Sequence, residues 1–200
     1  MHVESDYSAQ SRNQPPPARQ ASSLRVAPAP KDTLGCMSSH LQRDQGLCAN
    51  GIEIHRKTMA TQHLHYVETE CSARGVLLGI SMRDGHSRRV VSGRHASCHD
   101  FDKGSIYIRG FSERYRADIQ RPFDFVLLEI SQASLDRAIE DKQGKRVGSL
   151  VHVAGVRDDV LLNLAEALTP ALEHPAGASM LFVEQLSIAM TSYLVETYGG

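Results

Sequence analysis

The chain has 200 residues, of which 41% are hydrophobic and 22% are charged, and its formal net charge is −1. A chain of this length is expected to form one domain with room for an appendage. Because Lys and Arg do not exceed Asp and Glu, the composition argues against a nucleic-acid-binding surface. No apolar run approaches the roughly 20 residues of a membrane helix, so we expect no membrane partner.

The N-terminus and the cysteines indicate the compartment. The first residues are polar and acidic, unlike a secretory signal. The four cysteines are far apart and form no CxxC pair, which argues against a disulfide scaffold or a structural zinc site. We therefore expect reduced thiols in a cytoplasmic protein.

Residues 1–50 differ in composition from the rest of the chain. They contain five of the eight prolines, many Ser, Gln and Ala residues, and no sustained apolar pattern. Such a segment buries too little apolar surface to offset its chain entropy. The sequence therefore predicts a disordered tail over residues 1–50, in which a short apolar stretch, residues 34–47, could dock locally.

Residues 51–130 have the pattern of a β domain. Short apolar runs recur at spacings of roughly 10 residues between Gly, Asp and Ser clusters, which is typical of an all-β sandwich or barrel. The runs expected to form strands cover residues 63–67, 76–82, 105–109, 114–120 and 123–130. Residues 86–99, which include three histidines, are expected to be rich in loops.

After residue 130 the apolar spacing becomes helical. We expect a short helix first and then a loop through Gly155. Asp158 opens a second helix, and Ser179 can cap a last helix that runs to about Tyr198. Because the connection between the two long helices is short, they should form an antiparallel hairpin.

The last helix carries an apolar stripe whose spacing is close to a heptad seam. Its members are Phe182, Leu186, Ala189 and Tyr193. The stripe predicts a dimerisation surface, although it could equally pack on the preceding helix and the barrel. Residues 158–200 contain no Lys or Arg, so this hairpin is unsuited to contacting DNA phosphates.

Two parts of the sequence resemble the N-terminal regulatory domain of AraC-type transcriptional regulators. The first comprises Gly104–Ile108, Pro122–Ile130 and Leu135, and the second Leu181–Leu186 and Tyr193–Gly200. The resemblance implies an α+β chain, with a cupin-like β barrel over residues 51–130 and a helical dimerisation region over residues 131–200. It further implies a homodimer that senses a small-molecule effector. DNA would be bound only through a helix-turn-helix part that is absent from this chain.

Candidate effector ligands follow from the expected strands of the barrel. They are His63, His65, Tyr66, Tyr107 and Arg109. Strand alternation places His63 and His65 on one face and Tyr66 on the other, so these three cannot all point inward.

Two alternatives stay open. A stand-alone small metal cupin enzyme would use His63, His65 and a third ligand, but no glycine lies six residues before His63, as that family requires. A regulator that lacks a DNA reader could instead form mixed dimers with full-length relatives. The sequence has no nucleophile elbow, phosphate loop or dinucleotide fingerprint. We therefore expect a protein that is not an enzyme and that has no cofactor and no metal ligands.

Overall fold

The computed structural model describes residues 31–60, 65–140 and 149–200. The strands in these ranges are β1 (Arg43–Ala49), β2 (Ile52–Met59), β3 (His65–Thr69), β4 (Val76–Ser81), β5 (His86–Ser92), β6 (His95–Phe101), β7 (Ser105–Gly110), β8 (Tyr115–Ile119), β9 (Phe123–Ile130) and β10 (Val153–Arg157). The helices are α1 (Gln132–Glu140), α2 (Asp159–Glu173) and α3 (Met180–Tyr198), with short 3-10 turns at Ser38–His40 and Pro175–Gly177.

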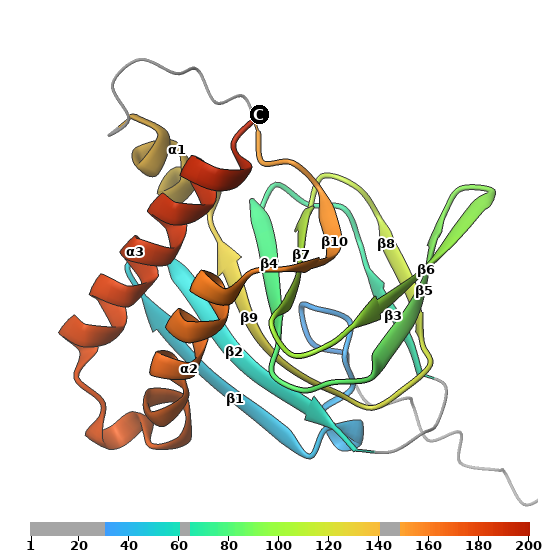
Figure 1. Ribbon diagram of the computed structural model, residues 1–200, viewed down its shortest axis with the longest axis horizontal. Helices are drawn as coiled ribbons and strands as arrows, with labels where there is room; N and C mark the ends of the chain where they lie inside the picture. The colour runs from blue at the N-terminus through green and yellow to red at the C-terminus, as the bar shows by residue number, and fades with distance from the viewer. Residues whose placement is uncertain (1–30, 61–64, 141–148) are drawn as a thin grey trace, which may run out of the picture.

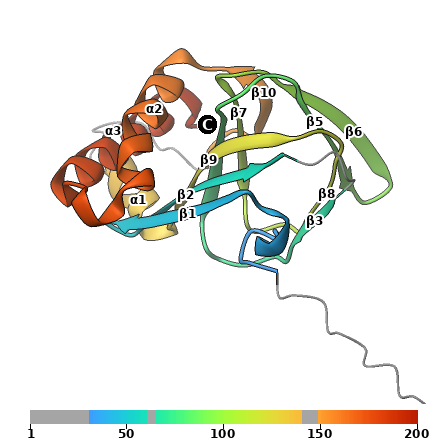
Figure 2. The same ribbon diagram turned by 90° about the horizontal axis from the view of Figure 1, so that it is seen from below.

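The strands form two antiparallel sheets. One has the order β1-β2-β9-β4-β7-β10, and the other has the order β3-β8-β5-β6. The sheets face each other and enclose a barrel (Figure 1). Helices α2 and α3 pack outside the barrel on the larger sheet, and the view from below shows all three helices gathered at that side (Figure 2).

The central strands of the larger sheet are buried on both faces. In β4 and β9, Leu78 and Leu128 belong to the apolar core under the helices, whereas Leu77 and Leu127 belong to a second core inside the barrel. This division follows from strand geometry, since successive side chains point to opposite faces. It also explains why these strands are almost continuously apolar.

Side-chain caps fix the beginnings of both long helices, as the sequence predicts. Asp158 Oδ1 accepts a hydrogen bond from the Leu161 amide at 2.9 Å, and Asp158 Oδ2 accepts one from the Tyr198 hydroxyl at 2.7 Å. Ser179 Oγ accepts from the Phe182 amide at 3.4 Å. Asp158 thus joins the start of α2 to the end of α3. Among the described residues, no helix has both the length and the apolar character needed to cross a membrane.

The predicted disordered tail through residue 50 is wrong for its last part. Strand β1 pairs with β2 along its whole length, from Arg43 opposite Thr58 to Ala49 opposite Ile52. The connection is Asn50-Gly51, with both φ angles positive at 52° and 75°. An Asn-Gly pair is the strongest short hairpin signal. Here the turn fixes the pairing register of β1 and β2, because the polar sequence of β1 has no apolar pattern to do so. Residues 1–30 of the predicted tail lie outside the described residues.

Strands outside the predicted bounds complete the barrel. The expected loop through Gly155 instead contains β10, which pairs with β7 and has a register shift between Ala154 and Val156. The stretch expected to be rich in loops forms the β5–β6 hairpin. Both segments are largely polar or exposed, so their pairing partners stabilise them and apolar periodicity does not reveal them. The barrel therefore extends beyond residues 51–130 on both sides.

Candidate functional site

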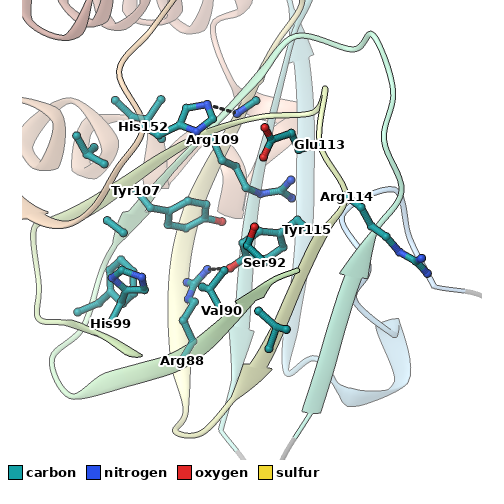
Figure 3. Close-up of a pocket in the computed structure, with 16 residues that line it drawn as sticks. Arg88, Val90, Ser92, His99, Tyr107, Arg109, Glu113, Arg114, Tyr115 and His152 are labelled. Carbon is teal, nitrogen blue, oxygen red and sulfur yellow. Dashed lines mark hydrogen bonds between the residues drawn. The ribbon is translucent and has the colours of Figure 1, made fainter. Parts of the chain in front are cut away.

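A cavity of about 360 Å³ opens where β10 and β6, the edge strands of the two sheets, approach each other. Its volume falls within the range of roughly 300–1,000 Å³ that small-molecule sites occupy. The residues that characterise it are Arg88, Val90, Tyr107, Arg109, Tyr115 and His152, drawn in Figure 3. The cavity therefore combines two buried arginine side chains with aromatic and apolar walls.

Arg88 on β5 is buried and lies against the aromatic rings of the barrel. Its Nε donates to Nε2 of His86 at 3.1 Å, and its Nη1 donates to the Tyr115 hydroxyl at 3.2 Å. The guanidinium carbon lies 4.5 Å from the ring centroid of Tyr107 and 4.7 Å from that of Phe101. These contacts are hydrogen bonds to neutral acceptors and cation–π interactions, and within the described residues no carboxylate pairs with this cation.

Arg109 on β7 is only 8% exposed. Its Nη2 donates to Thr69 Oγ1 at 3.2 Å, and that hydroxyl donates to the Leu34 carbonyl at 3.1 Å. Its Nε and Nη1 have no hydrogen-bond partner in the described part of the chain. The guanidinium stacks over Tyr115, 4.3 Å from the ring centroid. Burial lowers the pKa of Arg109, and the neighbouring Arg88 cation adds to that effect.

His86 is held neutral beside these arginines. Its Nδ1 lies 3.0 Å from the Arg121 carbonyl, so it carries the proton and leaves Nε2 free to accept from Arg88. Burial lowers the pKa of His86 to about 3, and the Arg88 cation contributes in the same direction. The imidazole therefore orients Arg88 and adds no charge to the site.

The segment before β1, which includes Asp32, Leu34 and Cys36, packs against the interior of the barrel. Lys57 Nζ lies 2.7 Å from Asp32 Oδ2 and also pairs with Asp44, so this buried ammonium is neutralised twice. Leu34 enters the inner apolar core. Burial, with Asp32 as a further cause, raises the pKa of the Cys36 thiol to about 12. Lys57 thus has acidic partners, whereas no carboxylate among the described residues pairs with Arg88 or Arg109.

The predicted effector ligands are only partly brought together. Tyr107 and Arg109 line the cavity side by side on β7. Tyr66 is 44% exposed and lies at a different end of the barrel, where Lys31 Nζ sits 5.4 Å from its ring centroid. His63 lies outside the described residues, and for His65 the structure describes only the backbone, at the start of β3.

Of the residues that line the cavity, sequence reasoning proposed only Tyr107 and Arg109 as ligands, and Arg88, Tyr115 and His152 are among those it missed. Arg88 was missed because its strand was expected to be loop. The spacing of His86, Arg88 and Val90 was the available signal, since alternate residues of a strand share one face.

The predicted dimerisation stripe lies at the margin of the buried face of α3. Phe182 is 49% exposed and Ala189 is exposed, whereas Leu186 and Tyr193 are partly buried against the core under the helices. The fully packed face of α3 is made by Val183, Ser187, Met190, Thr191, Leu194 and Val195. The stripe is thus divided between core packing and solvent.

Metal-ligating side chains do not converge within the described ranges. No group of three or more His, Cys, Asp or Glu residues there is placed to hold a metal ion. Because His63 lies outside these ranges, the metal-cupin alternative stays a prediction.

No family model matches this chain, and no curated protein matches it. Among solved structures, the AraC-like transcriptional activator CuxR is similar to it, with a TM-score of 0.52 and 13% identity. The match covers 78% of this chain and 56% of CuxR, so the chain spans little more than half of that protein.

Two further solved structures match with lower scores. A cupin superfamily protein from Desulfitobacterium hafniense DCB-2 has a TM-score of 0.35 and 8% identity, over 46% of this chain and 80% of that one. A cupin-2 domain protein from Shewanella frigidimarina NCIMB 400 has a TM-score of 0.34 and 10% identity, over 44% and 80% respectively. The predicted fold is confirmed: the chain is a cupin-like β barrel followed by a helical C-terminal part.

Proposed function

We propose that this chain is the effector-sensing and dimerisation domain of an AraC-type transcription regulator. It would modulate promoter binding through a helix-turn-helix part that is not present in this chain. The observation that carries the proposal is the cavity of about 360 Å³ in a barrel whose larger sheet also supports the helices. The overall likeness to CuxR supports the same assignment. In this proposal the cytoplasmic protein binds its ligand without transforming it.

Strand β7 offers a physical route between ligand and helices. Tyr107 and Arg109 face the cavity, whereas Ile106 and Ile108 pack in the core under α2 and α3. A ligand that shifts the inner side chains therefore acts on the element against which the helices rest. Couplings of this kind are typically worth about 1–3 kcal/mol.

The exposed side of α3 is the proposed dimer surface, and its occupant is a second copy of this chain. Leu181, Phe182 and Ile188 are 67%, 49% and 42% exposed. Residues 158–200 contain no Lys or Arg, so an acidic partner would have no cationic side chain to pair with on α3. Apolar, self-complementary faces of this type are usual in symmetric dimers.

A reporter assay tests the proposed dimerisation. The full chain is fused to a helix-turn-helix DNA reader that represses its operator only as a dimer. We expect the fusion to repress the reporter, Phe182→Asp to abolish repression, and the matched control Cys98→Asp, an exposed site on β6 in the other sheet, to leave it unchanged. Repression no stronger than that of the DNA reader alone would refute the proposed dimerisation.

A further inference from the structure

We infer that the ligand of the barrel cavity is a small organic oxyanion, whose carboxylate or phosphate oxygens are bound by Arg109 and Arg88. The inference rests on the proposed function, because it assumes that the cavity is a ligand site. It goes further by naming the chemical class of the ligand and the side chains that select it.

The unpartnered nitrogens of Arg109 are the first observation. A guanidinium has five N–H donors and no acceptor, so a buried one needs oxygen partners in several directions. Here only Nη2 has one, the Thr69 hydroxyl at 3.2 Å, while Nε and Nη1 have none among the described residues. Leaving buried donors unpaired is costly. An oxyanion supplies the missing acceptors, and Arg binds carboxylates and phosphates in a bidentate manner.

The charge balance of the barrel interior is the second observation. Neither arginine has an acidic partner in the described ranges. In contrast, Lys57 forms ion pairs with Asp32 and Asp44, and Arg74 Nη1 lies 2.9 Å from Glu129 Oε2. Glu113 is exposed at the rim of the cavity, and no ion pair joins it to either arginine (Figure 3). Among the described residues, the other two buried Lys or Arg side chains, Lys57 and Arg56, are both paired with carboxylates, whereas Arg88 and Arg109 are not.

The walls of the cavity indicate the rest of the ligand. Tyr107 and Tyr115 flank the arginines, and Val90, Val153 and Ala154 add apolar surface. Such walls suit a flat or apolar body attached to the anionic group. A cation would be repelled by the two guanidiniums, and a neutral ligand would leave their charge uncompensated.

Four probes separate charge from shape in the full chain, and two of them, benzoate and benzamide, are matched in size. They are benzoate, phenyl phosphate, inorganic phosphate and the neutral benzamide, each at constant ionic strength. Affinity is measured by isothermal titration calorimetry and by the ligand-dependent rise in melting temperature, since a ligand that binds the native state stabilises it by mass action. We expect at least one aromatic anion to bind ten or more times tighter than benzamide. The comparison of benzoate with phenyl phosphate decides which oxyanion is preferred.

Variants assign the binding to the arginines. Arg109→Met should weaken binding of the preferred anion at least tenfold and leave benzamide unchanged. Arg109→Lys keeps the positive charge but lacks the planar guanidinium that can bind two oxygens at once. It provides a second test should the Met variant not fold. The matched control is Arg89→Gln, because Arg89 is on the same strand as Arg88 but is exposed. Its Nη1 lies 3.8 Å from Asp118 Oδ2.

Three results overturn the inference. They are benzamide binding as tightly as benzoate, unchanged anion binding in both Arg109 variants, and no stabilisation of the folded wild type by any anion. The regulatory proposal is tested separately by the reporter. Anion binding without repression refutes the regulatory role alone, whereas repression without anion binding refutes the ligand class alone.

Discussion

The Tyr107 ring packs directly on Gly79 of β4, with which Tyr107 pairs across the sheet. A Cβ added at Gly79 would lie 2.0 Å from Tyr107 Cε1 and 2.4 Å from Cζ. Because the φ angle of Gly79 is not in the left-handed region, Gly79→Ala causes no backbone strain, and its whole effect acts on the ring. The ring would have to retreat by about 1.5 Å to reach ordinary contact.

The ring has little room to retreat. Its neighbours are Phe125, 5.6 Å away between ring centroids, Phe101 at 6.0 Å and the Arg88 guanidinium. We therefore expect Gly79→Ala to destabilise the fold by about 3 kcal/mol, the upper part of the range for overpacked cores. For a chain of this size that corresponds to a melting temperature lower by about 6–12 °C.

Urea unfolding followed by far-ultraviolet circular dichroism measures the loss. Gly177→Ala is the matched control, since its Cβ would meet nothing within 4 Å, and its stability should stay within about 0.5 kcal/mol of wild type. Removing the ring in Tyr107→Ala should relieve the clash, so the double variant Gly79→Ala/Tyr107→Ala should be more stable than the sum of the two losses by about 2 kcal/mol. Additive losses, or a Gly79→Ala variant as stable as the control, would show that the ring is not held as described.

Three further predictions concern other groups. Burial holds the pKa of His86 at about 3, below its unfolded value of 6.5, so between these values only the unfolded chain takes up the proton. Stability should be full above pH 6.5 and fall by up to about 1.4 kcal/mol per pH unit towards pH 3, and the slope should be shallower in His86→Gln when urea midpoints are compared. Asp158→Ala should cost about 2–3 kcal/mol, because it removes the cap of α2 and the acceptor of Tyr198 together, whereas Tyr198→Phe should cost about 1 kcal/mol; equal losses in thermal melts would contradict this division. The thiol of Cys36, with its pKa raised to about 12, should react with iodoacetamide at pH 8 at least tenfold more slowly than the three exposed cysteines, and equal rates by mass spectrometry would refute its burial.

The parts of the fold that are visible in the sequence are those whose stability is local or strongly apolar. Strand β9 was predicted with its observed bounds because it is buried on both faces. The helix start at Asp158 was predicted from acidic residues that suit the helix dipole, and the start at Ser179 was predicted from its cap. Strands β1, β6 and β10 were missed, since their side chains are mostly exposed, and β2 and β5 were missed because most of their residues are polar although several are buried. What holds them is backbone pairing with partners that are distant in the chain or joined by a turn.

The candidate site was predictable only where it rests on a predicted strand. Tyr107 and Arg109 were named because β7 alternates visibly. Arg88 was not, and its position beside Tyr107 follows from two sheets closing on each other. In the part of the chain that the structure describes, no acid pairs with either arginine, and this is a tertiary property that neither local composition nor spacing reveals.

The two-sided burial of β7 has a consequence for how such a chain can change over time. Side chains 107 and 109 border the cavity, whereas side chains 106 and 108 rest under the helices. Substitutions at the odd positions therefore alter what the chamber accepts without replacing a single atom of the helix support, and the reverse holds for the even positions. One short strand thus carries two sets of positions that can diverge separately, so ligand preference can be rewritten while the helical scaffold is kept.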